Sequence, residues 1–145
     1  MINQFKGPYS WLSNFEPVII YWKGFKFPTV EHAYVASKST NPKFWEKISK
    51  ISAKSTGLAK KEGRSIILRP NWENNKVYFM EQFLGQKFKY NKFKDKLLLT
   101  GSEKIVEGNY WHDNFWGDCY CEKCKNIEGK NMLGELIMII RRGLI

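Results

Sequence analysis

The stretch Phe27-Pro28-Thr29-Val30-Glu31-His32-Ala33-Tyr34-Val35-Ala36-Ser37-Lys38 decides how the first third of the chain folds. Pro28 ends an extended segment and Thr29 is a favourable N-cap, so a helix is expected to run to about Ser39. On it Glu31, Tyr34 and Lys38 are spaced i, i+3 and i+7 and share one face. That face suits the polar wall of a pocket, or a solvated surface with a well-placed first-turn glutamate.

The flanking segments predict a mainly α fold with a small N-terminal β element. Val18–Trp22 and Phe25–Phe27, joined by Lys23-Gly24, are typical of a hairpin. Hydrophobic periodicity and capping residues predict further helices. They begin near Asn41-Pro42, Ser52, Trp72 (capped by Asn71), Phe93 and Asn131, with a short apolar segment at 105–106 and a long loop over 108–129. We expect residues 1–145 to form one compact helical domain.

Composition narrows the class of protein. The chain has 145 residues, 43% of them apolar, which fits a folded domain rather than a disordered chain. Its net charge of +10 indicates either an anionic, phosphorylated partner or simply a basic surface. No apolar run reaches the roughly 18–20 residues of a membrane span, and the N-terminus lacks a secretory signal. We therefore expect a cytoplasmic protein that has no membrane partner.

Two groups of residues are candidates for substrate binding and acid–base work. Arg64 and Arg69 precede the helix that starts at Trp72, where guanidinium groups and helix N–H donors suit a phosphate. Trp72 either stacks on a planar base or anchors that helix to the core. Around Trp111 and Trp116, Asp113 and Asp118 suit acid–base chemistry beside a ring, or simply form turns.

Three cysteines and one histidine share the long loop. Cys119, Cys121 and Cys124 lie close to His112, but zinc sites usually take their ligands from two separated pairs. The crowding predicts a poor metal geometry, so we expect reduced structural thiols and no metal. Further upstream, Lys87–Lys94 alternates basic and aromatic side chains, a weak indication of nucleic-acid binding.

Taken in order, the motifs resemble the NADAR, or YbiA-like, family from about Asn3 to Arg141. They are Tyr9–Phe15, Phe27–Tyr34, Ala59–Arg64, Asn71-Trp72, Met80 with Lys87-Phe88, Thr100-Gly101, Glu107, Phe115–Gly117, Gly129–Gly134, Met138 and Arg141. The resemblance implies a helical N-glycosidase that needs no cofactor. It also implies that Glu31, Trp72 and Asp113 match the active-site Glu, Trp and Asp of the family. The cysteine run is where this chain departs from members that carry a short Gly-rich loop.

The resemblance implies a substrate that joins a base to ribose phosphate or ADP-ribose, such as a reactive riboflavin-pathway intermediate. Glu31 would stabilise the positive charge that develops on the ribose, with Asp113 as the second carboxylate. The remaining roles are stacking for Trp72 and Trp116, a polar wall for Tyr34, phosphate binding for Lys38, Arg64 and Arg69, and ribose binding for Asn14 and Asn131. Lys87 and Arg141 are weaker phosphate candidates.

Three alternatives to a small-metabolite glycosidase remain at this stage. The first is an enzyme that removes ADP-ribose from guanine in nucleic acid, which suits the charge of +10. The second is a non-catalytic module that binds NAD or ADP-ribose, and two carboxylates argue against it. The third is an accessory protein that binds nucleic acid without cleaving any bond.

Overall fold

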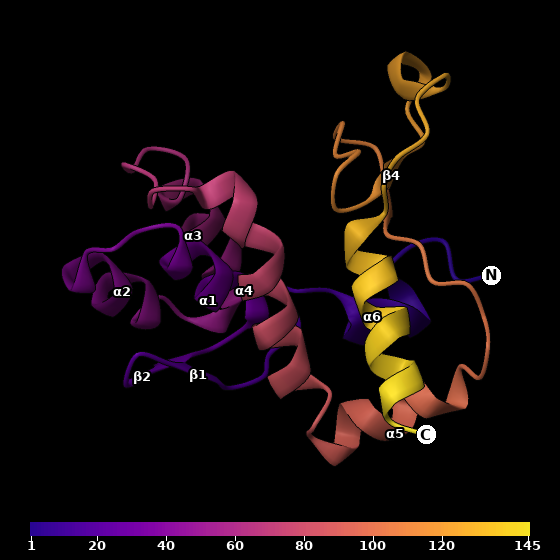
Figure 1. Ribbon diagram of the computed structural model, residues 1–145, viewed down its shortest axis with the longest axis horizontal. Helices are drawn as coiled ribbons and strands as arrows, with labels where there is room; N and C mark the ends of the chain where they lie inside the picture. Colours follow the sequence, from indigo (N-terminus) through magenta and orange to yellow (C-terminus); the bar gives the residue numbers. More distant parts are fainter. The chain divides into compact units, whose positions relative to one another are not determined.

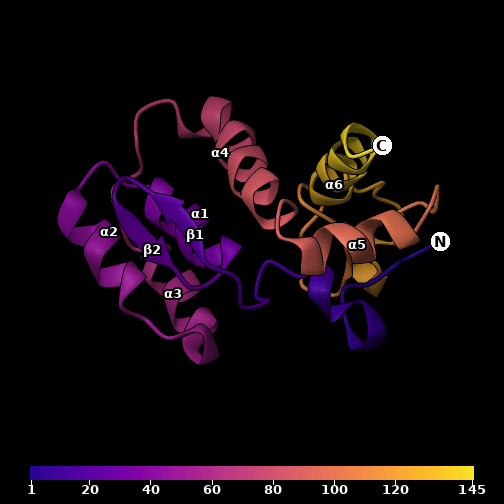
Figure 2. The same ribbon diagram turned by 90° about the horizontal axis from the view of Figure 1, so that it is seen from below.

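The structure is a computed structural model that describes residues 1–145, and the chain divides into two units. The central unit is Asn14–Lys89, and the terminal unit combines Met1–Ser13 with Tyr90–Ile145. Figures 1 and 2 show the two units in two views related by 90°. The expected mainly helical class is confirmed, since six α-helices accompany only short strands. That residues 1–145 form one domain stays a prediction.

The central unit is built around one buried helix. Its elements are β1 (Ile20–Trp22), β2 (Phe25–Phe27), α1 (Val30–Ser37), α2 (Pro42–Ser49), the 3₁₀ turn η2 (Ala53–Ser55), α3 (Thr56–Glu62) and α4 (Trp72–Lys87). Every residue of α1 is buried, because α2, α3, α4 and the hairpin all pack around it (Figure 1). This burial excludes the solvated-face alternative for Glu31 and Tyr34.

Local sequence signals account for the hairpin and for the start of α1. β1 and β2 pair antiparallel, with Ile20 opposite Phe27. Lys23 and Gly24 both adopt positive φ, as a two-residue type I′ turn requires. The Thr29 hydroxyl oxygen accepts from the His32 N–H at 3.1 Å, which confirms the predicted cap.

The start of α4 differs from the prediction. Asn71 adopts a left-handed conformation (φ 59°) and its side chain makes no cap hydrogen bond. Its carbonyl instead accepts from the Asn74 N–H and from the Asn75 side chain, both at 3.0 Å. Asparagine tolerates this conformation better than most residues, so Asn71 serves the loop-to-helix turn as a backbone group.

The terminal unit surrounds the last helix. Its elements are η1 (Gly7–Leu12), α5 (Asn91–Leu99), β3 (Gly108–Asn109), β4 (Asp118–Cys119), η3 (Glu122–Cys124) and α6 (Met132–Gly143). β3 and β4 pair in parallel, and the expected segment at 105–106 contributes only an isolated bridge from Ile105 to Ile2. The segment around η3 projects beyond β4, at the end of this unit away from α5 (Figure 1).

Polar contacts and close backbone packing fix the start of α6. Asn131 is the N-cap residue of α6, which confirms that the last helix opens there, although its backbone is left-handed (φ 51°) and its side chain makes no cap hydrogen bond. A Cβ atom on Gly134 would collide with the Ile105 carbonyl and the Asn131 side chain, which explains glycine at this position. No helix combines the length and the apolar character that crossing a bilayer requires.

Candidate active site and the cysteine loop

The buried start of α1 positions Glu31. The Glu31 N–H donates to the Asn14 carbonyl at 3.1 Å, and only 9% of Glu31 is exposed. The neighbouring His32 ring is held between the Thr29 hydroxyl (2.7 Å) and the Ile51 carbonyl (2.9 Å). Because a carbonyl only accepts, Nε2 of His32 carries the proton and Nδ1 accepts from the hydroxyl. This network fixes the helix turn that carries Glu31.

The protonation state of His32 agrees with this hydrogen-bond network. Burial lowers the pKa of the imidazole below its usual range, and backbone hydrogen bonds at Ile51 and Ser52 oppose that change only in part. A neutral His32 beside Glu31, with its Nε2 proton bound to the Ile51 carbonyl, therefore serves as a structural support for the helix.

Asn14 lies beside the first turn of α1 with an unsatisfied polar atom. Its Oδ1 is buried and makes no hydrogen bond, while Nδ2 lies 3.6 Å from the Met80 sulfur. A buried acceptor without a partner costs free energy, and such groups in folded proteins call for an explanation. A buried amide oxygen without a partner suits a ligand that supplies a hydroxyl donor.

Lys38, the residue that follows α1, lies within electrostatic range of Glu31 and of three other cations. Burial lowers the pKa of the Lys38 ammonium, and the negative charge of Glu31 opposes that effect. The positive charges of Lys60, Arg64 and Lys76 lower the Lys38 pKa further. These four cations, which we call the basic cluster, therefore lie around Lys38, and Lys38 is the member that the carboxylate of Glu31 influences.

The basic cluster contains two residues that sequence reasoning missed. Lys38 and Arg64 are predicted candidates, whereas Lys60 and Lys76 are not. Lys60 falls within the quoted Ala59–Arg64 motif, and Lys76 follows Trp72 by one helical turn. The motif could have identified Lys60, and the helical spacing from Trp72 could have identified Lys76.

The charge of the chain is concentrated in the central unit. Asn14–Lys89 holds 14 Lys and Arg against 6 Asp and Glu, a net +8. The terminal unit holds 10 against 8, a net +2. The unit that carries Glu31 and the basic cluster therefore provides most of the positive field.

Trp72 forms an aromatic wall with its neighbours. Its ring centroid lies 5.3 Å from that of Tyr34 and 5.9 Å from that of Phe79, with an interplanar angle of 21° to Phe79. Trp72 is only 6% exposed and Tyr34 only 7%. These contacts support the anchoring role, because Trp72 fastens α4 to α1; stacking on a base stays a prediction.

Arg69 has a structural role in place of the expected phosphate contact. Its Nε donates to the Ser37 carbonyl at 2.9 Å and Nη2 to the Ser39 carbonyl at 3.2 Å. The guanidinium also lies 5.1 Å from the ring centroid of Phe79. The side chain thus ties the loop before α4 to the end of α1, and phosphate binding by Arg69 stays a prediction.

In the terminal unit, Asp113 shapes a turn. Its Oδ1 accepts from the Phe115 N–H (3.1 Å) and the Trp116 N–H (2.9 Å), an Asx-type turn. The Asn109 side chain holds the backbone of Asp113 on both sides, at 3.2 and 2.8 Å. Of the two roles predicted for Asp113, acid–base chemistry and turn formation, the hydrogen bonds of Oδ1 support turn formation. Trp116 is half-buried with its ring edge-on to Phe115 at 4.8 Å.

Asn131 is occupied within the terminal unit. Its Oδ1 accepts from the Glu107 N–H and its Nδ2 donates to the Ile105 carbonyl, both at 2.9 Å. The side chain is 6% exposed. It therefore bridges the start of α6 to the segment before β3, and the predicted ribose contact is not supported.

The two weaker phosphate candidates are also buried. Burial lowers the pKa of Lys87 to about 7, with Glu16 opposing the change, and none of the residue is exposed. Arg141 donates to the Thr100 hydroxyl and to the Glu103 carbonyl, each at 2.8 Å. Neither side chain presents its charge at the surface.

The metal-binding side chains of the cysteine loop lie closer together than their spacing in the sequence predicts. The nearest metal-binding atoms of His112, Cys119, Cys121 and Cys124 all lie within 4.8 Å of one another. The prediction of a poor geometry is therefore wrong: the loop folds back, so residues crowded in sequence surround a single point.

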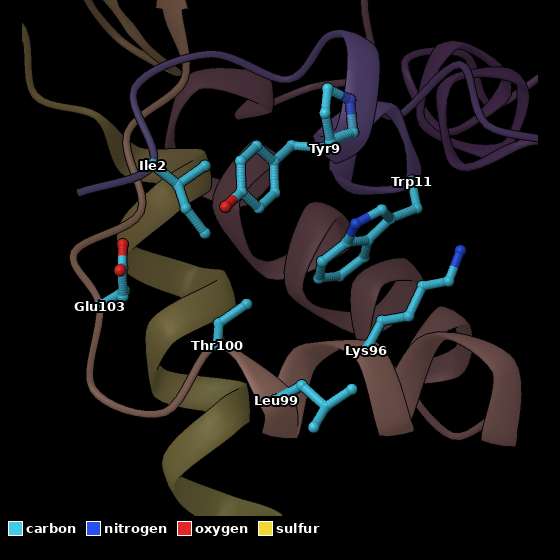
Figure 3. A pocket seen from close by; sticks show the side chains of 8 residues that line it. Ile2, Tyr9, Trp11, Lys96, Leu99, Thr100 and Glu103 are labelled. Carbon is cyan, nitrogen blue, oxygen red and sulfur yellow. The ribbon is translucent and has the colours of Figure 1, made fainter.

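A separate pocket of about 360 Å³ lies in the terminal unit (Figure 3). Figure 3 shows Tyr9 and Trp11 of η1 facing Leu99 and Thr100 at the end of α5. The one carboxylate of the lining, that of Glu103, pairs with the N-terminal amine at 3.0 Å. None of the predicted site residues lines this pocket.

Comparison with known proteins identifies the relatives of this chain. The NADAR domain profile matches residues 2–145. N-glycosidase YbiA of Escherichia coli (strain K12) is 35% identical over 94% of this chain and 82% of its own length. N-glycosidase Npun_R5314 of Nostoc punctiforme is 34% identical over 92% and 85%.

A chloroplastic protein and a solved structure extend the comparison. The riboflavin biosynthesis protein PYRR of Zea mays is 33% identical over 83% of this chain but only 20% of its own length. The NMR structure of E. coli YbiA matches with a TM-score of 0.81 at 33% identity, covering 99% of this chain and 86% of that one. The resemblance predicted from the motifs is confirmed.

Proposed function

The chain belongs to the NADAR family and is an N-glycosidase, and from this premise we propose that its substrate is a nucleobase-like ring joined to ribose phosphate. The observation that carries the proposal is the buried carboxylate of Glu31 within electrostatic range of Lys38, the residue at the centre of the basic cluster. The name of the Zea mays relative, a riboflavin biosynthesis protein, supports an intermediate of that pathway as the substrate.

In this proposal Glu31 acts on the sugar. Breaking the C1′–N bond leaves the electron pair on the ring nitrogen and develops positive charge on the ribose. The carboxylate stabilises that charge and accepts a proton from the attacking water, whose oxygen bonds to C1′. The leaving nitrogen gains a proton, so the products are the free base and ribose phosphate.

The basic cluster would hold the phosphate. Arg64 presents a guanidinium that binds two oxygens at once, and the three lysines supply point charges. Lys38 is partly desolvated, so its contact with a phosphate is screened less than a surface contact would be. Asn14 would bind a ribose hydroxyl through the buried oxygen that has no partner.

The aromatic and terminal-unit residues carry separate hypotheses. Tyr34 and Trp72 would form the wall of the base pocket, which agrees with their mutual contact. Asp113 and Trp116 would act as second carboxylate and stacking ring, roles that the family resemblance implies and that mutation can test one at a time.

A second candidate is removal of ADP-ribose from guanine in nucleic acid. The net charge of +8 on the central unit favours it, because a small ribose phosphate carries far less charge than a polynucleotide. Simple binding of NAD or ADP-ribose is less favoured, because an anion-binding module gains nothing from a buried carboxylate beside the anion.

A substrate panel distinguishes these functions. The purified chain is incubated with aminopyrimidine ribotides, their dephosphorylated forms, and guanine-linked ADP-ribose as nucleoside and in an oligonucleotide. Mass spectrometry then quantifies the freed base. We expect the ribotides to have the highest kcat/KM and removal of the phosphate to lower it by at least about tenfold, the loss of one charge-assisted contact. Preference for the oligonucleotide would select the second candidate.

A further inference from the structure

The loop between β3 and β4 brings four metal-binding side chains to one point. The parallel pairing sets Asn109 beside Cys119, so the chain leaves β3, turns through His112 and returns. The short turn η3 then folds Cys124 back. Nδ1 of His112 lies 3.2 Å from the Cys121 sulfur and 3.5 Å from the Cys124 sulfur.

We propose that His112, Cys119, Cys121 and Cys124 form a tetrahedral zinc site. Zinc bonds of about 2.3 Å to sulfur and about 2.0–2.1 Å to nitrogen give a ligand tetrahedron with edges of roughly 3.5–3.8 Å. The four donor atoms already lie within 4.8 Å of one another. Nδ1 of His112 is 3.5 Å from the Cys124 sulfur, which equals the shorter edge, and 3.2 Å from the Cys121 sulfur, which is slightly less. Closing onto an ion thus needs small side-chain movements.

The surroundings of Cys119 suit a thiolate ligand. Its sulfur accepts from the His112 N–H at 3.3 Å and from the Cys121 N–H at 3.5 Å. Backbone donors of this kind orient a coordinating sulfur and stabilise its negative charge. The cysteines form no disulfide, and Cys119 and Cys124 are buried.

The donor set selects zinc and a structural role. Three thiolates and one imidazole are a ligand combination typical of structural zinc, and they fill all four positions. Oxygen-preferring ions such as magnesium and calcium are disfavoured by the sulfurs. An iron–sulfur cluster places several atoms between its ligands, whereas these donors surround a single point.

The site would order the segment that carries Asp113 and Trp116. His112 precedes Asp113 directly, and Cys119 follows two residues after Gly117. His112 also adopts a left-handed backbone (φ 68°), which costs free energy for a residue with a Cβ atom. Metal binding supplies a free energy that offsets this cost, and it would clamp both ends of the 112–119 turn.

Metal analysis of the full chain tests the proposal. Protein expressed with added zinc and dialysed is analysed by inductively coupled plasma mass spectrometry, and we expect one zinc per chain. Cys124→Ser and His112→Ala should lose this zinc. Glu122→Gln is the matched control, because it changes an exposed acidic side chain within the Cys-x2-Cys run and should keep it.

A second measurement decides the question if the variants fail to fold. Wild-type protein stripped by a chelator is titrated with Co²⁺, and we expect thiolate charge-transfer and tetrahedral visible bands that saturate at one equivalent and vanish when zinc is added. If Co²⁺ gives no such bands in the stripped protein, the zinc found in the untreated protein is background and the proposal is overturned. Iron in place of zinc, or equal zinc in wild type and both variants, overturns it as well.

Discussion

The central unit and the 107–131 segment of the terminal unit position their candidate site residues by different means. Glu31 and Tyr34 are fixed because α1 is buried on every side. Asp113 and Trp116 sit on a segment in which asparagine and aspartate side chains bind backbone groups, with the four metal-binding side chains beside them. The first arrangement depends on apolar packing and the second on polar contacts.

The two regions should therefore differ in their tolerance of substitutions that remove a polar contact. A residue on a buried helix keeps its place when one polar contact is removed, because the packing of neighbouring helices remains. A residue on a loop without a core depends on each hydrogen bond. Conservative changes in the central unit should therefore report on chemistry, whereas changes in the loop should affect order and chemistry together.

The largest expected effect comes from Glu31→Gln in the central unit. The amide keeps the shape of the side chain but neither carries the negative charge nor accepts a proton from water, so kcat should fall about 10²–10⁴-fold. Steady-state kinetics on the preferred substrate measure it. The control Glu46→Gln alters an exposed carboxylate paired with Lys50 and should leave kcat unchanged. A folded Glu31→Gln protein with wild-type kcat would remove Glu31 from the mechanism.

Changes in the basic cluster should act mainly on KM. Lys38→Met and Arg64→Ala each remove a charge that would hold phosphate, and each should raise KM by about 10–100-fold, as expected for a charge-assisted hydrogen bond. Lys43→Met removes an exposed lysine of α2 as the control. If the dephosphorylated substrate shows the same loss as the phosphorylated one, the cluster does not bind phosphate.

Asp113→Asn separates the negative charge of Asp113 from the hydrogen bonds with which its side chain forms the turn. The amide oxygen still accepts from Phe115 and Trp116, so the turn persists while the negative charge is lost. We expect kcat to fall about tenfold with little change in melting temperature, less than the loss of a principal acid–base group causes, because Glu31 remains in place. Asp113→Ala, which loses the turn as well, should also lower the melting temperature. An unchanged kcat in Asp113→Asn would leave Asp113 as a turn residue alone.

The last prediction concerns stability rather than activity, through the pH dependence that the buried Lys87 introduces. Burial lowers its pKa to about 7 from the ordinary 10.5, so between these pH values the unfolded chain binds a proton that the folded chain does not. The stability contributed by this residue should therefore rise with pH across that window, by up to about 1.4 kcal/mol per pH unit. Urea unfolding of wild type and Lys87→Met at pH 7, 8 and 9 measures the difference. Parallel pH dependences would contradict it, and Lys89→Met is the exposed control.

Local signals made much of the fold predictable. The Thr29 cap and the Lys23-Gly24 turn depend on residues within a few positions of each other, so the sequence pattern contains them in full. In such segments the apolar periodicity and the capping residues agree, and prediction succeeds.

Long-range polar contacts were not predictable. Arg69 binds carbonyls about 30 residues earlier, and Asn131 binds groups about 25 residues earlier. The composition of the two segments does not indicate that these side chains are hydrogen-bonded to distant backbone groups. The clustering of the metal-binding side chains in the cysteine loop was unpredictable for the same reason. A left-handed His112 and a parallel strand pair bring together donor atoms that sequence spacing alone disfavours.

The most direct test of the central claim is to quantify the free base and ribose phosphate together in one time course with wild-type protein. Hydrolysis of an N-glycosidic bond predicts that both products appear in equal molar amounts and at the same rate, over many turnovers per chain. Saturable binding of the ribosylated base with the substrate recovered intact would contradict the account and identify the chain as a binding module.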